Sequence, residues 1–136
     1  MKTLLILTIS LVAFKGNTQI LAVWKGNCPG HERQWEHPAN WSTNEVPDEF
    51  SDVVIPLDVS AEAHYPVISR TAAEINSLHI WPGAVLTINK GSLEIFDIGK
   101  SVFRRHQVIG NGTINYRGQE EVSPHYLANS KPEQNN

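Results

Sequence analysis

The sequence predicts an all-β protein, a short right-handed parallel β-solenoid that begins with an irregular, Trp-rich N-terminal cap. Pairs of aliphatic residues separated by one polar residue recur at steps of eight and seven, in Leu78/Ile80, Leu86/Ile88 and Leu93/Ile95. Each pair places two apolar side chains on one face of a strand. Glycines interrupt these strands, and only Asn111-Gly112 has the signature of a two-residue hairpin turn. Such short steps favour a coiling chain with roughly three strands per turn of about 22 to 24 residues.

The N-terminus predicts an exported protein. With 136 residues, the chain suits one domain with a core of its own. It begins MKTLLILTISLVAF, where one lysine precedes an apolar stretch that is short for a bilayer span and typical of a signal peptide. We expect residues 1–18 to be this signal, with cleavage just before Gln19. No later segment reaches the length of a membrane helix, so the predicted location is extracellular or on the outer cell surface.

Cysteine content and charge argue against a disulfide-stabilised domain and against a nucleic-acid-binding protein. The only cysteine, Cys28, cannot form an internal disulfide, so packing and backbone pairing must stabilise the fold. It has no apolar lipobox before it, which argues against a lipid anchor. Loss of Lys2 and Lys15 with the signal leaves 9 basic against 14 acidic residues, a net charge of −5. Nucleic acid is therefore not an expected partner.

Residues 19–50 are rich in Trp, Pro and Asn and lack a sustained period, which predicts the cap, with one short strand at Ile20–Trp24. Two roles are open for its tryptophans. Large aromatic side chains cover the exposed end of a strand stack well. Tryptophans also stack on sugar rings, so the candidate carbohydrate-binding residues are Trp81, Trp41 and Trp35. For Trp24, Trp35 and Trp41 we favour the covering role, and Trp81, before Pro82-Gly83, is expected at a partly exposed corner.

Residues 51–118 are expected to form the solenoid. The β-branched runs DVVIPLDV (52–59) and HYPVIS (64–69) indicate strands, and TAAEINSLHI (71–80) leads directly into strand patterns, so we expect it to be extended rather than helical. Further strands are expected around 85–88, 93–95 and 114–116. GKSVFRRHQ (99–107) is irregular and predicts no strand. Residues 119–136 are polar and contain prolines, so we expect a disordered tail.

The order of these motifs resembles that of a module in secreted and surface proteins of Bacteroidetes. The resemblance rests on W-K-G (24–26), N-W-S (40–42), D-V-V-I-P (52–56), Y-P-V-I (65–68), I-N-S-L-H-I-W-P-G-A-V-L-T-I (75–88) and I-G-N-G-T-I-N-Y-R-G (109–118), and covers about residues 23–118. It implies a β-solenoid opened by a Trp-rich cap, in adhesin-like proteins exported by the type IX route. Members of that group usually continue into long arrays and a sorting domain. This chain ends at Asn136, which puts covalent retention at the surface in doubt.

Three patterns that suggest a reactive or metal site are better explained by structure. HERQWEH has His31 and His37 six residues apart, whereas a zinc-binding helix needs histidines four apart. The carboxylates of Asp48, Glu49, Asp52 and Asp58 resemble a calcium loop or a glycosidase pair, but Asp52 before V-V-I-P is more simply a turn residue that bonds its own backbone. Arg104 and Arg105 alone are a weak sign of a polysaccharide lyase, and a shared fold does not assign function.

The sequence thus predicts a secreted or cell-surface structural or adhesive module without catalytic activity, metal or cofactor. One alternative is a carbohydrate-binding module that uses exposed Trp, and another is the remnant of a polysaccharide-active β-helix enzyme. The expected partners are an extracellular polysaccharide and a second copy of the chain joined end to end. Neither nucleic acid nor a membrane span in the mature chain is expected.

Overall fold

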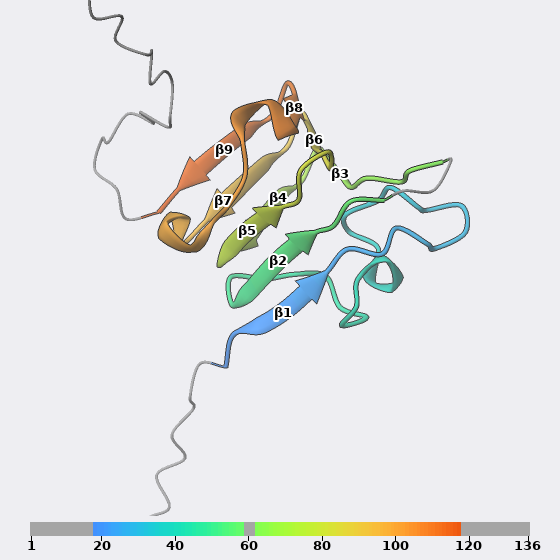
Figure 1. The fold of residues 1–136 in the computed structure, drawn as a ribbon, viewed down its shortest axis with the longest axis horizontal. Helices are drawn as coiled ribbons and strands as arrows, with labels where there is room; N and C mark the ends of the chain where they lie inside the picture. The colour runs from blue at the N-terminus through green and yellow to red at the C-terminus, as the bar shows by residue number, and fades with distance from the viewer. Residues whose placement is uncertain (1–17, 59–61, 118–136) are drawn as a thin grey trace, which may run out of the picture.

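The computed structural model describes residues 18–58 and 62–117 (Figure 1). The predicted signal peptide and the predicted tail lie outside these residues, apart from Thr18. The two described ranges belong together, because residues 52–55 of the first pair in parallel with residues 77–80 of the second.

The described residues form an all-β structure of short strands. The 3-10 helices are single turns, η1 (Pro38–Asn40), η2 (Ile98–Lys100) and η3 (Arg105–Gln107). The strands are β1 (Ile20–Val23), β2 (Ser51–Ile55), β3 (Val67–Ser69), β4 (Ala72–Ile75), β5 (Ser77–Ile80), β6 (Leu86–Asn89), β7 (Ser92–Ile95), β8 (Val108–Gly110) and β9 (Thr113–Tyr116). The extended reading of residues 71–80 is confirmed as β4 and β5. The irregular segment 99–107, which is described throughout, contains no strand.

The strands pair in parallel in three sheets of three strands each, in the orders β1-β2-β5, β3-β6-β8 and β4-β7-β9. The register steps are short. Ala72 pairs with Ser92 and Ser92 with Thr113, at steps of 20 and 21 residues, while Asp52 pairs with Ser77, a step of 25. From β3 onward the chain visits the three sheets in a fixed order, and an isolated bridge from His79 to Val102 continues the first sheet after β7.

The core consists of aliphatic side chains stacked from strand to strand. Because paired parallel strands place in-register residues on the same face, an apolar residue in one strand lies against its counterpart in the next. The buried ladders are Ala22-Val53-Leu78, Ile55-Ile80, Ile68-Ile88, Ala73-Leu93 and Ile75-Ile95. The sequence pairs that predicted the strands are therefore the residues that build the core.

Residues 25–50, here called the cap, close the end of the stack next to β1. The Trp35 N–H donates to the Val67 carbonyl at 3.2 Å and the Val67 N–H donates to the Arg33 carbonyl at 2.7 Å, so the cap pairs with the edge of β3. Inside it, the Trp41 ring packs edge-to-face on Trp35 and on Trp24, with centroids 4.7 and 4.9 Å apart. The side chain of buried Asn40 donates to the carbonyls of His31 and Gln34, which fixes the loop without regular structure.

The other end of the stack, formed by β8, β9 and the Val102–Phe103 segment, is called the open end. A hollow of about 480 Å³ lies there, lined mostly by apolar residues that include Phe103, Val108 and Ile114. Val108 and Ile114 are in register with the fully buried Leu86 and Leu93 one strand below, but they are only partly buried themselves. Figure 1 shows β8 and β9 at the far end of the stack from β1.

Candidate functional site

The most exposed tryptophan lies on a tight turn just after β5. The Ala84 N–H donates to the Trp81 carbonyl at 3.0 Å, and Gly83 between them has a φ of +89°. Pro82 followed by a glycine with positive φ is the pattern of a type II turn. Side chains are strained at such a φ, and a Cβ on Gly83 would also meet the Leu57 side chain at 2.9 Å. The turn therefore holds the Trp81 backbone rigidly, while its indole is 48% exposed.

The other two predicted carbohydrate-stacking residues are buried. Trp35 is 1% exposed and Trp41 is fully covered. The Trp41 indole N–H donates to the Trp35 carbonyl at 2.8 Å, so the pair is fixed within the cap. Their ring faces contact protein, which leaves Trp81 alone of the three with a surface for a ligand.

Two cations flank Trp81 in the strand register. Val23 pairs with Val54, so two residues further on Lys25 aligns with Pro56. Ile55 pairs with Ile80, which aligns Pro56 with Trp81. His79 pairs with Val102, which aligns Trp81 with Arg104 two residues later. Backbone hydrogen bonds continue this alignment: the Trp24 N–H donates to Val54, the Trp81 N–H to Ile55 and the Ile80 N–H to Val102, at 2.9 to 3.0 Å. We call these four residues the outer corner.

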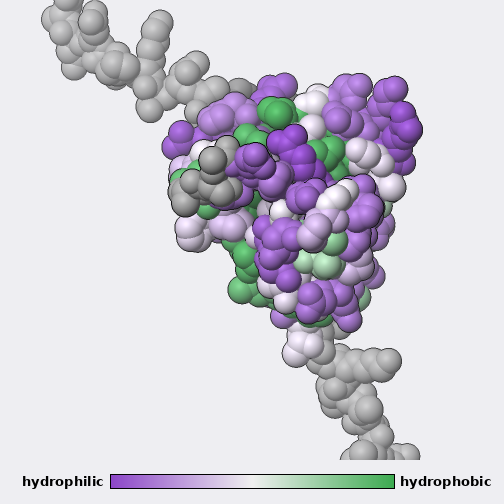
Figure 2. Space-filling view, turned by 90° about the vertical axis from the view of Figure 1, so that its right-hand side faces the viewer, coloured by the Kyte–Doolittle hydropathy of each residue, from purple (hydrophilic) through white to green (hydrophobic). Residues whose placement is uncertain are grey.

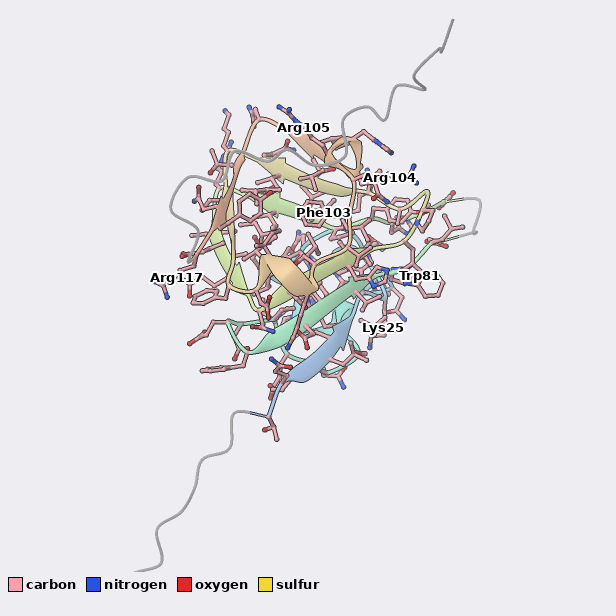
Figure 3. All side chains as sticks on the ribbon, turned by 60° about the vertical axis from the view of Figure 1, so that its left-hand side comes forward. Lys25, Trp81, Phe103, Arg104, Arg105 and Arg117 are labelled. Carbon is pink, nitrogen blue, oxygen red and sulfur yellow. The ribbon has the colours of Figure 1, made fainter. Side chains whose placement is uncertain are left out.

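A buried glutamine ties Trp81 to Arg104. Gln107 is 4% exposed, and its side-chain amide donates to the Trp81 carbonyl at 2.7 Å while its amide oxygen accepts from the Arg104 N–H, also at 2.7 Å. The planar side-chain amide of Gln107 thus fixes the backbone of Trp81 relative to that of Arg104. In Figure 3, Lys25, Trp81 and Arg104 lie along one side of the ribbon, whereas Arg117 lies on the opposite side.

The cations of the outer corner are available for a ligand. Lys25, Trp81 and Arg104 are all exposed. The ion pairs of the described residues join Lys100 to Asp97 and Arg117 to Glu94, so Lys25 and Arg104 have no carboxylate partner among them. The corner therefore presents an aromatic face between two uncompensated positive charges.

The carboxylates have structural partners. Asp48 accepts from the Phe50 N–H and the Ser51 hydroxyl, which is the turn role we expected for Asp52. That expectation was wrong for Asp52, which lies inside β2 and accepts from the side chains of Asn76, just before β5, and Ser77, the first residue of β5, at 2.7 and 2.6 Å. The sequence could not reveal this contact, because it joins residues 24 and 25 positions apart.

The histidine-rich segment of the cap forms a series of tight turns. The rings of His31 and His37 are stacked, with centroids 4.8 Å apart, and the Cys28 sulfur lies 3.6 Å from His37 Nε2. Stacked rings do not direct two nitrogens at a common point. Across residues 18–58 and 62–117, no group of three or more His, Cys, Asp and Glu side chains converges to hold a metal ion.

Lys25 and Gln107 are the residues of this site that sequence reasoning missed. Lys25 lies in the W-K-G motif, which drew attention only to the tryptophan, and Gln107 lies in the segment judged irregular. The sequence carries no signal for them, because the alignment of Lys25 with Trp81 depends on strand pairings across loops of unequal length.

Comparison of the chain with protein-family models, with curated proteins and with solved structures finds no match. In the part of the chain that the structure covers, no helix has the length and apolar character needed to cross a membrane. The molecule is thus defined by its own geometry, as an all-β stack of short parallel strands with a capped end, an open end and an exposed aromatic and cationic corner.

Proposed function

We propose that this chain is a right-handed parallel β-solenoid that acts outside the cell or on its surface as a structural or adhesive module, without catalytic activity. The observation that carries the proposal is the contrast between its two ends, one covered by the cap and the other apolar and exposed. A solenoid buries the apolar face of each turn only against its neighbours, so an exposed last turn is a surface for a further turn of strands.

The fixed order in which the chain visits its sheets supports the solenoid. From β2 onward the register steps of 20 to 25 residues are close to the repeat expected for three strands per turn, while the step from β1 to β2 is 31 residues because the cap lies between them. The buried ladders follow the same step, so each turn repeats the packing of the one before it. Hydrophilic residues cover most of the face seen in Figure 2, which suits a module that meets water along its sides.

The partner we propose for the open end is a second copy of the chain. The hollow there is apolar, and Arg104 and Arg105 at its rim provide the only charges among its lining residues. A copy brings the same Val108, Ile114 and Tyr116 surface, so two open ends are chemically alike and can pair around a two-fold axis.

Sedimentation velocity over a wide range of concentration tests this assembly. We expect the chain to dimerise and Ile114→Lys to remain monomeric, because Ile114 continues the buried Leu93 ladder and a charge there would be buried at the joined ends. Leu57→Lys is the matched control, since Leu57 is 45% exposed but does not line the hollow. A chain that stays monomeric at every concentration, or Leu57→Lys acting as Ile114→Lys does, would overturn end-to-end assembly. Circular dichroism dominated by helix would overturn the solenoid itself.

A second candidate function, carbohydrate binding, is favoured by the exposed indole of Trp81. Aromatic side chains with one open face and a fixed backbone provide rigid contact surfaces. Trp81→Ala removes that face without touching the core, so glycan binding that disappears in this variant while the fold is retained would support it. The enzyme alternative has less support, because Asp97, the acidic residue that would act with Arg104 in such an enzyme, accepts a hydrogen bond from the Lys100 N–H at the start of η2. Turnover of an acidic polysaccharide that is lost on changing Arg104 or Asp97 would reinstate it.

A further inference from the structure

We infer that the outer corner binds an anionic glycan, with Trp81 stacking on a sugar ring and with Lys25 and Arg104 pairing with its carboxylate or sulfate groups. The inference rests on the adhesive role proposed above and names the class of ligand that this role requires. Arg104 also lies at the rim of the hollow at the open end, whereas Lys25 and Trp81 do not line it.

The spacing of the corner suits a linear polymer. Neighbouring strands are about 4.8 Å apart, so the four aligned residues extend over about 14 Å, with the indole inside and a cation at each end. Gln107 fixes the positions of Trp81 and Arg104, and the ladder from β1 through β2 to β5 fixes Lys25. The backbone is therefore rigid before a ligand arrives, which reduces the loss of freedom on binding.

The charges around the indole favour an acidic ligand over a neutral one. Lys25 and Arg104 have no ion-pair partner among the described residues, and Arg105 and His106 follow directly in the chain, both exposed. A neutral sugar would use the indole face but leave these charges without a role. A carboxylate or sulfate on the sugar would pair with them, and an arginine binds such groups with two parallel hydrogen bonds.

A glycan suits the corner better than a nucleic acid does. The outer corner offers one aromatic face, whereas proteins that bind single-stranded nucleic acid stack successive bases on several aromatic side chains. Two or three cations beside one aromatic ring match a few sugar units that carry carboxylate or sulfate groups.

Affinity electrophoresis of the purified chain in native gels tests the inference, with polygalacturonate, dextran sulfate or neutral dextran cast into the gel. We expect retardation by the two anionic polymers and none by dextran. Trp81→Ala should weaken binding about tenfold, and Lys25→Gln and Arg104→Gln a few-fold each with a smaller dependence on salt, because fewer screened charges take part. Lys90→Gln is the matched control, since Lys90 is exposed at a different corner, between β6 and β7.

Other electrophoresis results distinguish the anionic-glycan site from carbohydrate binding in general and from end-to-end assembly. Trp81-dependent retardation by dextran as strong as by the anionic polymers overturns the anionic ligand but leaves carbohydrate binding in place. No retardation by any polymer overturns both, while the solenoid and its assembly are still judged by sedimentation. Equal binding of a mixed-sequence single-stranded DNA overturns the glycan as the ligand class. A Lys90→Gln effect equal to that of Lys25→Gln shows general attraction and also overturns the site. Circular dichroism of each variant confirms that its fold is retained.

Discussion

The two ends of the strand stack differ in how they cover the apolar interior. At the β1 end, three tryptophans, a buried asparagine and a pairing to β3 cover the apolar interior. At the β8 and β9 end, residues of the same aliphatic kind are half exposed around a hollow of about 480 Å³. A stack of parallel strands has no internal way to end, because each strand leaves unpaired backbone groups and an apolar face for the next. The comparison teaches that this chain fully buries large aromatic side chains at one end only.

The largest expected effect is at the centre of the cap. Trp41→Ala should lower the free energy of unfolding by about 3 to 5 kcal/mol, because it removes a fully buried aromatic ring and leaves a cavity between Trp24 and Trp35. Urea denaturation followed by circular dichroism measures the change. Trp81→Ala is the matched control, with the same chemical change at an exposed site, and is expected to lower the unfolding free energy by less than about 1 kcal/mol.

If Trp41→Ala and Trp81→Ala lowered the stability equally, the cap would not be the structural centre of the fold. The two ends would then differ in composition but not in their contribution to stability. Ile109→Ala at the open end extends the test, because a 49% exposed side chain without a covering layer should change stability by less than about 1 kcal/mol.

A smaller effect is expected where the cap begins. Gly26 has a φ of +59°, and an added Cβ would lie 2.5 Å from the His64 carbonyl oxygen and 2.7 Å from Trp24 Nε1. The Trp24 indole N–H donates to that same carbonyl at 2.7 Å, so Gly26→Ala would separate the two partners. We expect a loss of about 2 to 3 kcal/mol from the strained backbone and the broken hydrogen bond.

Gly30 provides the control for this position, because it also has a positive φ but an added Cβ would meet nothing within 4 Å. Gly30→Ala therefore measures the backbone strain alone. A Gly26→Ala variant no less stable than Gly30→Ala would show that the contact with His64 and Trp24 does not hold the cap.

Next in size is the polar link beside the open end. Gln107→Leu keeps much of the side-chain volume but leaves the Trp81 carbonyl and the Arg104 N–H without their partner, and should lower the unfolding free energy by about 1 to 2 kcal/mol. It should also weaken binding at the outer corner, where Gln107 acts only by positioning, and Gln107→Glu, which still accepts from Arg104, should restore part of it. A Leu variant that binds polygalacturonate as the unaltered chain does would remove the positioning role.

The strands could be predicted from the sequence because their signal is local. Alternation within three residues marked Leu78, Leu86 and Leu93 as inward-facing, and the structure buries all three. The contacts that form the candidate site are not local: Gln107 reaches Trp81 over 26 positions, and Lys25 aligns with Trp81 through two intervening pairings. A single sequence does not specify register across loops of unequal length, so the identity of Trp81 as a candidate was predictable but its cationic neighbours were not.

The smallest expected effect concerns acid, and it distinguishes the cap again from the open end. The pKa of Glu32 is held below its ordinary value, first by a hydrogen bond from its own backbone N–H and then by one from the Gly30 N–H, which lies 2.8 Å from the carboxylate. A depressed carboxyl pKa contributes stability above the unfolded pKa and loses it as the pH falls through the folded value. The loss must therefore occur on the acid side of an ordinary glutamate, and it is small because the carboxylate is in contact with solvent and screened. NMR titration of the Glu32 carboxyl carbon should give a midpoint below that of glutamate in an unstructured peptide, and Glu32→Gln should make the acid limb of the stability curve slightly flatter. An ordinary midpoint in the folded chain would show that the loop after Cys28 does not hold the carboxylate, and with it that this part of the cap is less ordered than its tryptophan centre.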